Sequence, residues 1–554
     1  MVARIPLIVN SSAEQIQELP SGDSISIPGD LNVTGSITGN SVHAVQLTAD
    51  GTIAAHAPVT LTSAGKVKAI STVAENLTGG STGTFITGSG SQGIYSINDS
   101  CWLGGQNAAV VAWRIKSSTS SLDQDLQLIA GTLSGTSISW GTRLDTGSLL
   151  SGGISHIHLA SNNNDKAILM YHESGNGHMK VRTFTVSGTT ITLGTEVTLR
   201  TNSNEGNLCY LGDDGGSSYF AVAYVHSGDA EVKIIKHDGH NSMTVSAAGA
   251  NGVGVPNGAN HDEMKLIGIS HNRFLVSVGK GNESRTIHVC TRLGTTDCRI
   301  APGYTSAELG EASQAPFGVS SNTYGAELYE YTDETGLYDP INEKFIMWVS
   351  AGGGSRGRIR VYNIDGDTIK FQFESDFINT GVETGHYEMY PSLEVTDKGQ
   401  IIVAWQDFSN HYGKRIVGSY NHERDGITWG TVTTWSSEWT GTVKQVKADD
   451  GKIITVYHDT AQTGGYNISG KSKVFQTATT TLTSDNFLGF SAAGYSDGNT
   501  ARISLSGSTT TKSSLTIGKK YYVQDNGTLA TTRESFDVVA GKALSATSLL
   551  ITDV

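Results

Sequence analysis

Three carboxylates stand at similar places in the chain and are the first candidates for chemistry. Glu173, Asp407 and Asp459 each follow a run of apolar residues that ends in an aromatic side chain and a His or Gln. Glycoside hydrolysis needs two carboxyl groups about 5–9.5 Å apart, on either side of the scissile bond. Acids at such positions also accept hydrogen bonds from backbone N–H groups of turns, a role that needs no substrate. The pattern favours structural acids, and we predict that the protein is not an enzyme.

A second motif is similar to part of an enzyme site. Residues 425–430, DGITWG, resemble the Asp-box of sialidase-type enzymes, S-x-D-x-G-x-T-W, but Gly426 directly follows Asp425 and no Ser stands two residues before it. A sialidase-like site would also need three arginines around a carboxylate and a Tyr–Glu pair. Arg358 and Arg360 alternate with apolar residues, as solvent-facing strand positions do. We interpret the motif as a hairpin turn, and a glycan-cleaving enzyme is the third alternative for the function.

Metal-binding motifs are incomplete in this chain. His172 and His458 lack the spacing of the H-E-x-x-H motif. Residues 212–216 and 363–367 are acidic enough to suggest calcium, but neither fits the full calcium-loop pattern. Hairpin turns explain both segments, so we predict no metal site and no cofactor.

A repeat in the middle of the chain decides the predicted fold. A strand-like run that ends in a bulky residue recurs seven times, at Trp113, Tyr171, Tyr224, Val278, Val349, Trp405 and Tyr457. The spacing of 52–71 residues suits a four-stranded antiparallel sheet with its loops. Runs of β-branched and aromatic residues, bounded by Gly, Asn, Asp and Ser, indicate strands almost throughout. We predict an all-β protein in which residues 81–483 form a seven-bladed β-propeller.

The last repeat is short of one strand, which residues 82–88 (TGTFITG) are placed to supply, closing the ring. A solenoid or a row of sandwiches is the competing architecture. A row of sandwiches would not need seven units of near-equal length.

The sequences on either side of the repeats match each other. Val59, Leu61, Gly65 and Val67 have the same spacing as Tyr521, Val523, Gly527 and Leu529. Both patterns predict a strand, a Gly turn and a return strand. We predict one small β-barrel or β-sandwich domain with residues 44–75 as its first half and 484–554 as its second, and the propeller inserted between them. Two separate small domains are the alternative, although the short N-terminal piece could hardly bury a core alone.

Composition limits the partners. The net charge is −14 over 554 residues, which argues against nucleic acid or an anionic membrane surface. No apolar run approaches the ~20 residues of a membrane helix, so we expect no membrane insertion.

Residues 1–43 contain short alternating fragments interrupted by Gly and have no way to bury their apolar positions alone. We predict that they form an anchoring arm, with a flexible N-terminus as the alternative.

Segments at both ends of the chain resemble proteins of virus particles. Residues 4–39 are similar to the N-terminal segment of structural proteins of tailed bacteriophages, especially fibre-type proteins of marine myoviruses. Residues 487–507, 515–532 and 538–551 are similar to a module of phage fibre and virion proteins. The resemblance implies a virion component, assembled in the host cytoplasm and carried on the extracellular particle. It also implies docking on other virion proteins through residues 1–43 and a homo-oligomer, which we expect to be a trimer.

Loop lengths predict where a ligand would bind. In a β-propeller, connections between the second and third strands share one face with those joining successive blades. The long connections 249–262, 305–325 and 379–391 fall on that face, with 406–414 beside them. The residues that we expect to contact a ligand there are Tyr324, Tyr387, Tyr390, Asp407, Phe408 and Tyr412. Aromatic faces beside hydrogen-bonding groups suit sugars.

The sequence thus predicts a phage fibre or appendage protein that displays its propeller for attachment to a glycan or protein of the host-cell surface. The alternative is a decoration or cement protein of the capsid or tail, without receptor binding. A cement protein should bind particles in many copies and change their stability, which separates the two readings.

Overall fold

The computed structural model divides the chain into two compact units, Thr72–Thr479 and a second unit built from Met1–Ser71 with Thr480–Val554. It describes residues 7–10, 15–18, 43–88, 92–117, 125–146, 154–245, 252–255, 263–270, 272–279, 286–305, 336–350, 357–377, 391–407, 410–421, 425–459, 468–483, 485–533 and 536–552. Within these ranges every regular element is a β-strand, apart from one 3₁₀ turn, η1 (Gly104–Gln106). The predicted all-β class is confirmed. Of the predicted arm 1–43, the described part holds β1 (Leu7–Asn10) and β2 (Gln15–Glu18), which pair antiparallel.

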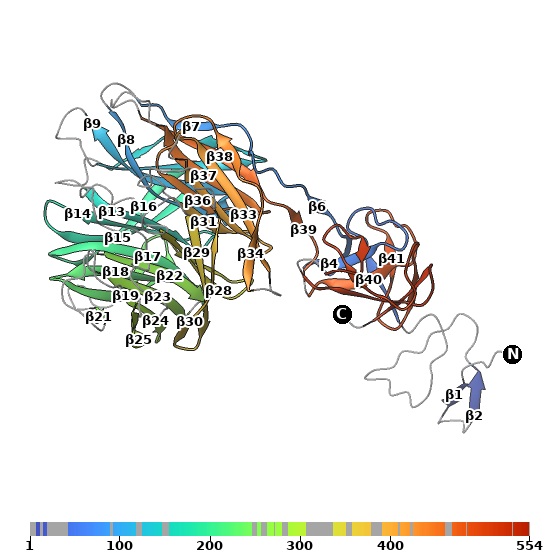
Figure 1. Cartoon of the computed structure of the whole chain (residues 1–554). Coiled ribbons are helices and arrows are strands. Elements are labelled where there is room, and N and C mark those ends of the chain that lie inside the picture. Colours follow the sequence, from blue (N-terminus) through green and yellow to red (C-terminus); the bar gives the residue numbers. More distant parts are fainter. Residues whose placement is uncertain are drawn as a thin grey trace. The chain divides into compact units, whose positions relative to one another are not determined.

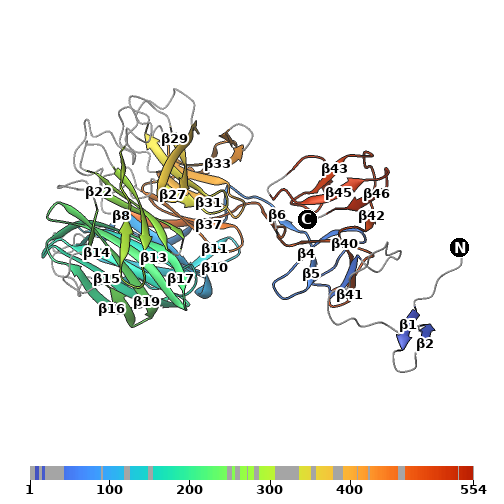
Figure 2. The ribbon, with the colours of Figure 1, turned by 90° about the horizontal axis from the view of Figure 1, so that it is seen from below.

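The described part of the unit Thr72–Thr479 holds seven sheets built around four antiparallel strands (Figures 1 and 2). The first three are β8 (Gln92–Leu103), β9 (Ala108–Ser117), β10 (Leu126–Ser134) and β11 (Ser137–Trp140); β13 (Ile154–Ser161), β14 (Ala167–Glu173), β15 (His178–Ser187) and β16 (Thr190–Arg200); and β17 (Ser203–Asp214), β18 (Ser217–His226), β19 (Asp229–Gly239) and β20 (Ser242–Val245). In each of them the strands pair in chain order, so neighbouring strands are joined by short connections.

The other four sheets repeat the pattern. They are β22 (Glu263–Ser270), β23 (Arg273–Gly279), β24 (Thr286–Arg292) and β25 (Cys298–Ile300); β27 (Gly336–Asp339), β28 (Lys344–Ser350), β29 (Gly357–Asp365) and β30 (Thr368–Asp376); β31 (Ser392–Val395), β32 (Ile401–Gln406), β33 (Gly413–Asn421) and β34 (Gly426–Trp429); and β36 (Val443–Lys447), β37 (Lys452–Asp459), β38 (Ser469–Gln476) and β7 (Gly83–Ile86). Short strands extend four of the seven sheets, each pairing with a third strand: β12 (Leu144–Asp145), β21 (Val253–Gly254), β26 (Tyr304–Thr305) and β35 (Thr433–Ser436).

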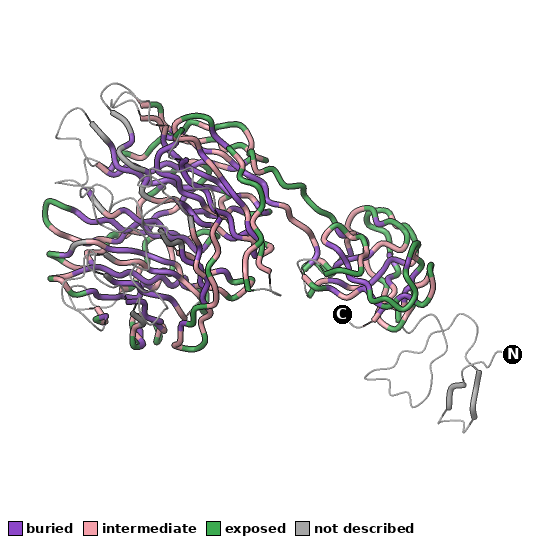
Figure 3. Tube along the Cα trace, viewed as in Figure 1, coloured by how far each residue is buried: buried purple, intermediate pink, exposed green. Residues whose placement is uncertain are grey.

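The second strand of each sheet carries the bulky residue of the sequence repeat, as predicted. Every residue of β14 and β32 is buried. The reason is visible in β9, whose alternate residues belong to two different apolar clusters: Ala108, Val110 and Ala112 to one, and Ala109, Val111 and Trp113 to the other. A strand covered on both faces needs apolar residues at every position, which makes it easy to recognise in a sequence. Figure 3 shows buried residues running along the strands of these sheets.

The last sheet takes its fourth strand from the N-terminal side of the unit, as the sequence predicts. Strand β7 pairs antiparallel with β38, and Figure 1 shows the blue β7 beside the orange β38. Phe85 of β7 is 7% exposed, and its ring centroid lies 5.6 Å from that of Trp113 and 5.2 Å from that of Trp140 in the first sheet. Strand β7 therefore joins the beginning and the end of the unit.

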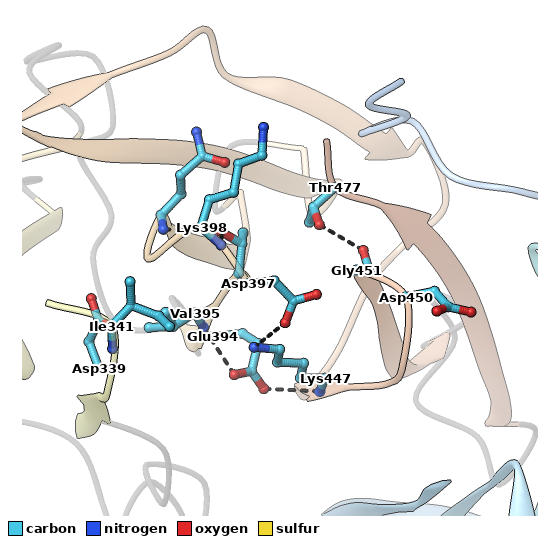
Figure 4. Close-up of polar contacts among 12 residues, drawn as sticks. Asp339, Ile341, Glu394, Val395, Asp397, Lys398, Lys447, Asp450, Gly451 and Thr477 are labelled. Atoms are coloured by element: carbon cyan, nitrogen blue, oxygen red, sulfur yellow. Dashed lines mark hydrogen bonds and ion pairs between the residues drawn. The ribbon is translucent and has the colours of Figure 1, made fainter. Parts of the chain in front are cut away.

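Side chains on the first strands link successive sheets. The Asp99 carboxylate accepts a hydrogen bond from Leu159 N at 2.8 Å, and the side-chain oxygen Oδ1 of Asn207 accepts one from Leu266 N at 2.9 Å. Figure 4 shows the same device between β31 and β36, where Glu394 Oε2 accepts from Lys447 N at 3.1 Å. The Lys447 ammonium also contacts Asp397 at 2.7 Å. These bonds satisfy backbone groups of the first strands and link each sheet to the next.

The second unit contains two five-stranded sheets, and the first of them combines strands from both ends of the chain. One has the order β3 (Ala44–Thr48), β41 (Thr500–Ser504), β40 (Phe487–Ser491), β4 (Pro58–Leu61), β5 (Val67–Ala69), and the other the order β42 (Thr509–Thr511), β46 (Ser548–Ile551), β45 (Val539–Ala543), β43 (Lys520–Val523), β44 (Leu529–Ala530). Figure 2 shows blue β4 and β5 together with red β40 and β41. The first sheet therefore needs strands from both flanks of the chain. Where the chain passes from one unit to the other, β6 (Thr72–Val73) pairs with β39 (Thr479–Thr480).

The matching residue patterns in the two flanks form matching hairpins. Gly65 turns β4 into β5 at φ +72°, and Gly527 turns β43 into β44 at φ +76°. The two turns have the same backbone hydrogen bonds. In the first, Thr62 N donates to Lys66 O and Gly65 N to Thr62 O; in the second, Gln524 N donates to Thr528 O and Gly527 N to Gln524 O. The predicted strand, Gly turn and return strand are confirmed in both places.

The two sheets are also equivalent at a tight backbone contact. Gly489 in β40 and Gly541 in β45 have φ of +150° and +149°. A Cβ at either position would overlap a carbonyl oxygen of the paired strand, that of Ser504 or that of Leu550. Only glycine fits such an approach, so both sheets contain the same glycine-dependent irregularity.

Candidate binding surface

Four of the six predicted ligand-contacting residues lie outside the described residues. They are Tyr324, Tyr387, Tyr390 and Phe408, and most of the connections 249–262, 305–325 and 379–391 lies outside as well. Asp407 and Tyr412 are described, and they meet across the β32–β33 connection, where Asp407 N donates to Tyr412 O at 2.8 Å. This connection is the part of the predicted face on which a site can be built.

The β32–β33 connection is held by its own backbone. His411 N donates to Asp407 O at 2.6 Å, with His411 in the left-handed region at φ +59°. Asn410 Oδ1 accepts from Tyr412 N at 2.9 Å. The Asp407 side chain is 5% exposed as a residue and lies 3.5 Å from Lys414 Nζ, so its carboxylate is engaged inside the protein. Tyr412 and His411 are partly exposed.

A tryptophan that sequence reasoning missed stacks on this connection. The Trp439 indole lies parallel to the His411 imidazole, with centroids 3.4 Å apart and an interplanar angle of 18°. Thr440 N donates to His411 O at 2.8 Å and fixes the segment 437–442 against the β32–β33 connection. Trp439 is partly exposed. The sequence did contain a signal for Trp439, namely the second tryptophan of WSSEWT (435–440). Burial in a strand explains Trp435 but leaves Trp439 unexplained.

A lysine held by two carboxylates contacts Glu438, the residue that precedes Trp439. Lys471 Nζ is 2.5 Å from Glu438 Oε2 and 2.7 Å from Asp459 Oδ2. Burial alone would lower the pKa of Lys471, but the hydrogen bonds to Asp459 and Glu438 outweigh it and raise the pKa. Glu438 adjoins Trp439, so aromatic and ionised groups occur together on the segment 437–442. This mixture binds sugars well, since they offer apolar C–H faces and hydroxyl groups.

The three carboxylates predicted to be equivalent do occupy one repeated position. Each is paired with a lysine on the next strand: Glu173 with Lys180 at 2.7 Å, Asp407 with Lys414 at 3.5 Å, and Asp459 with Lys471 at 2.7 Å. In the strand register each lysine lies opposite the bulky residue of the sequence repeat in its sheet, which is aromatic in all three. Every carboxylate is thus engaged by a cation in its own sheet, an arrangement that stabilises the ends of the strands.

His458 lies beneath the same segment and is buried and uncharged. Its Nε2 accepts a hydrogen bond from Thr442 N at 3.0 Å, so this nitrogen carries no proton. Gly441 lets the backbone pass here, because a Cβ at that position would overlap the imidazole ring. Burial lowers the pKa of His458 to about 4.

The lowered pKa predicts acid sensitivity. The unfolded chain has a histidine pKa of about 6.5, so between about pH 6.5 and 4 the unfolded state binds more protons than the folded state. The stabilising contribution of neutral His458 is therefore complete above pH 6.5 and is lost as the pH falls towards 4, by about 3 kcal/mol in all. His237, whose pKa burial also lowers to about 4, acts in the same direction. In urea unfolding measured from pH 7.5 to 4.5, His458→Gln should flatten the loss of stability, whereas His226→Gln, at a partly exposed position, should leave it unchanged.

Other reactive groups are arranged without an evident site. All four cysteines are free and buried, and burial raises the pKa of Cys209 and of Cys298 to about 12. Among the described residues no group of three His, Cys, Asp or Glu side chains is placed to hold a metal ion. No described helix is long and apolar enough to span a membrane.

Comparisons with known proteins give solved structures alone. No family model matches the chain, and no curated protein matches its sequence. The sialidase NanB of Streptococcus pneumoniae is similar at 10% identity over 71% of this chain and 70% of its own, with a TM-score of 0.38. The periplasmic gluconolactonase of Pseudomonas aeruginosa is similar at 10% identity over 62% and 86%, with a TM-score of 0.36.

A lectin of Aleuria aurantia is similar at 12% identity over 64% of this chain and 98% of its own, with a TM-score of 0.31. Likenesses at this level say nothing about activity. The repeated four-stranded antiparallel sheets by themselves describe an all-β, β-propeller-like fold.

Proposed function

We propose that this protein is a non-enzymatic structural component of a tailed-phage particle, of the fibre or appendage type. Residues 1–43 attach it to other virion proteins, and a small domain displays a seven-bladed β-propeller. The propeller attaches the particle to a glycan of the host-cell surface. The resemblance of residues 4–39 and of the C-terminal segments to phage virion proteins supports the virion part of this proposal.

The proposed architecture rests on the order of the strands. In the second unit, β44 is followed by β45 after residues 531–538, whereas the equivalent β5 is followed by β40 only after the whole of Thr72–Thr479. The propeller thus occupies the place of one short loop of a duplicated β domain. Insertion at a loop whose ends lie close together leaves the host domain able to fold.

The observation that carries the attachment function is the Trp439–His411 stack. His411 lies on the connection between β32 and β33, the second and third strands of one sheet, and Trp439 lies on the segment that leads from β35 to β36 of the next sheet. These two kinds of connection share one face of a propeller. Partly exposed aromatic rings beside ionised groups serve recognition better than folding, because the same rings would gain more by complete burial. The lysine partners of Glu173, Asp407 and Asp459 favour binding over hydrolysis at this face.

The test uses the purified full-length protein on immobilised bacterial lipopolysaccharides and capsular polysaccharides. Trp439→Ala should weaken binding by about tenfold or more, while Phe371→Ala, at a 44%-exposed phenylalanine on β30, should not. If the two variants bind equally well, the stacked rings of Trp439 and His411 are not part of the binding site. The decoration role would be established instead by three results: the wild type does not bind, the particle carries many copies of the protein, and the particle is less stable without it.

Oligomeric state is the second measurement. Light scattering should give a trimer for the full-length protein and a monomer for a chain without residues 1–43. Trimerisation would strengthen weak sites through multivalency. A full-length monomer would argue for a decoration subunit whose arm orders on the particle.

A further inference from the structure

A charged side chain occupies an apolar position between two sheets. Arg415 of β33 is 0% exposed and lies opposite Ala404 in the strand register. In each sheet the bulky repeat residue of the second strand pairs with a residue of the third strand, and Arg415 is the residue that follows this partner in β33. The residues at the same position in the other six sheets are small or apolar: Leu128, Val181, Val232, Ile287, Ile359 and Ser472. The sheet of β31–β34 therefore departs from the repeat at Arg415.

The buried guanidinium is oriented by specific contacts. Arg415 Nη2 donates to Thr455 Oγ1 at 2.5 Å and to Gln445 Oε1 at 3.1 Å. Gln445 is itself held by Ser392, to whose carbonyl its Nε2 donates at 2.8 Å, so its acceptor oxygen faces Arg415. The guanidinium carbon lies 3.2 Å from the centroid of the Phe475 ring. Both hydrogens of Nη2 are used, and the planar group cannot turn freely.

The rest of the guanidinium lacks partners. Nε and Nη1 are buried, and neither has a hydrogen-bond acceptor among the described residues. No carboxylate of the described residues forms an ion pair with Arg415. Lys473 is a further cation that interacts with Arg415: its pKa is lowered by burial and then by the charge of Arg415, and its ammonium donates to Trp435 O at 2.6 Å. A buried and unpaired charge is among the most destabilising arrangements in a protein.

We propose that a small inorganic anion, chloride or another halide, binds to Nε and Nη1 of Arg415 between the sheet of β31–β34 and that of β36–β38. Water would accept hydrogen bonds there but would leave the charge uncompensated, whereas an anion does both. Arginine keeps its proton in almost every environment, so loss of the charge is the less accessible solution. The Phe475 ring lies against the guanidinium and belongs to an apolar cluster with Ala404 and Trp435, so an occupant among these side chains would have to be a small ion. The site is independent of the proposed attachment function.

Halide dependence of stability tests the proposal. We expect the thermal unfolding midpoint of the full-length protein to rise by about 2 °C or more, and to saturate, as sodium chloride replaces sodium gluconate at constant ionic strength. Arg415→Met should abolish the rise. Arg299→Met, which removes an exposed arginine from its ion pair with Asp367, should retain it. A midpoint that does not depend on chloride in the wild type, or a rise that persists in Arg415→Met, would overturn the proposal.

Bromide provides a readout that does not depend on the variant folding. Crystals of the wild-type protein grown in sodium bromide should give an anomalous peak within contact distance of Arg415 Nε or Nη1. Peaks confined to the surface would refute the site. Electron density for phosphate or sulfate beside Arg415, without an anomalous peak for bromide, would refute the assignment to a halide.

Discussion

Phe85→Ala is expected to lower the unfolding free energy of the unit Thr72–Thr479 by about 3–5 kcal/mol. The phenyl ring is 7% exposed and packs between Trp113 and Trp140. It also fills the space beside Gly470, where a Cβ would overlap it. Truncation leaves a cavity whose rigid aromatic walls cannot close around it, so the cost should lie at the upper end of the range for buried phenylalanine.

The effect has a second cause in the position of β7. This strand pairs with β38 of the last sheet and packs on the first sheet, so weakening it separates the two ends of the unit. The matched control is Phe371→Ala on β30, at a 44%-exposed position, which should cost less than about 1 kcal/mol. Urea unfolding followed by tryptophan fluorescence measures both. Similar losses in the two variants would mean that β7 is not required to hold the first and last sheets together.

The second strands of the sheets could be predicted because their signal does not depend on strand register. Both faces of β14 or β32 are covered, so every position is apolar and the strand stands out in any reading of the sequence. The first strands gave a weaker signal. In β13 the ladder shifts between Ser155 and His158, and His156 adopts φ +48°, which breaks the alternation of buried and exposed residues.

The candidate site could be predicted only in part. Asp407 and Tyr412 come from one short segment, and their neighbourhood follows from the sequence. The Trp439–His411 stack joins residues from two connections through the Thr440–His411 backbone hydrogen bond, and no local pattern reports such a contact. Arg415 was hidden for a different reason, because an arginine within a strand normally reads as a solvent-facing residue.

The boundaries between the units differ from the predicted ones for a local reason. The sequence places the limits of the inserted part at 81 and 483, whereas the structure divides the chain at Ser71 and Thr480. Thr481 N donates to Ser71 O at 3.0 Å, and Ser71 N donates to Thr481 Oγ1 at 2.9 Å, which ties these residues to the smaller unit. Threonine-rich segments such as 477–483 carry no hydrophobic contrast from which a boundary could be read.

Replacing residues 74–478 by Asn-Gly is expected to leave a folded β domain. The connecting segments are in register, since Ser71 pairs with Thr481 and Asn76 with Gln476. A two-residue turn after Val73 is therefore the length that closes the ladder, and Asn-Gly favours the turn type that matches the twist of the flanking strands. The shortened protein should keep its β-sheet circular dichroism spectrum and should unfold in one cooperative transition in urea.

This result follows from the duplication within the smaller unit. The apolar cluster that contains Phe490, Leu549 and Ile551 draws its residues from that unit alone. The second sheet already has the short connection 531–538 at the place where the first sheet has the inserted unit. Gly541→Ala in the shortened protein is the control for specific folding, because the added Cβ would overlap the Leu550 carbonyl and should abolish the cooperative transition or weaken it by about 2–4 kcal/mol. If the shortened protein unfolds without cooperativity even with Gly541 in place, the inserted unit is needed to hold the first sheet, and the two units would then have to be regarded as one folding domain.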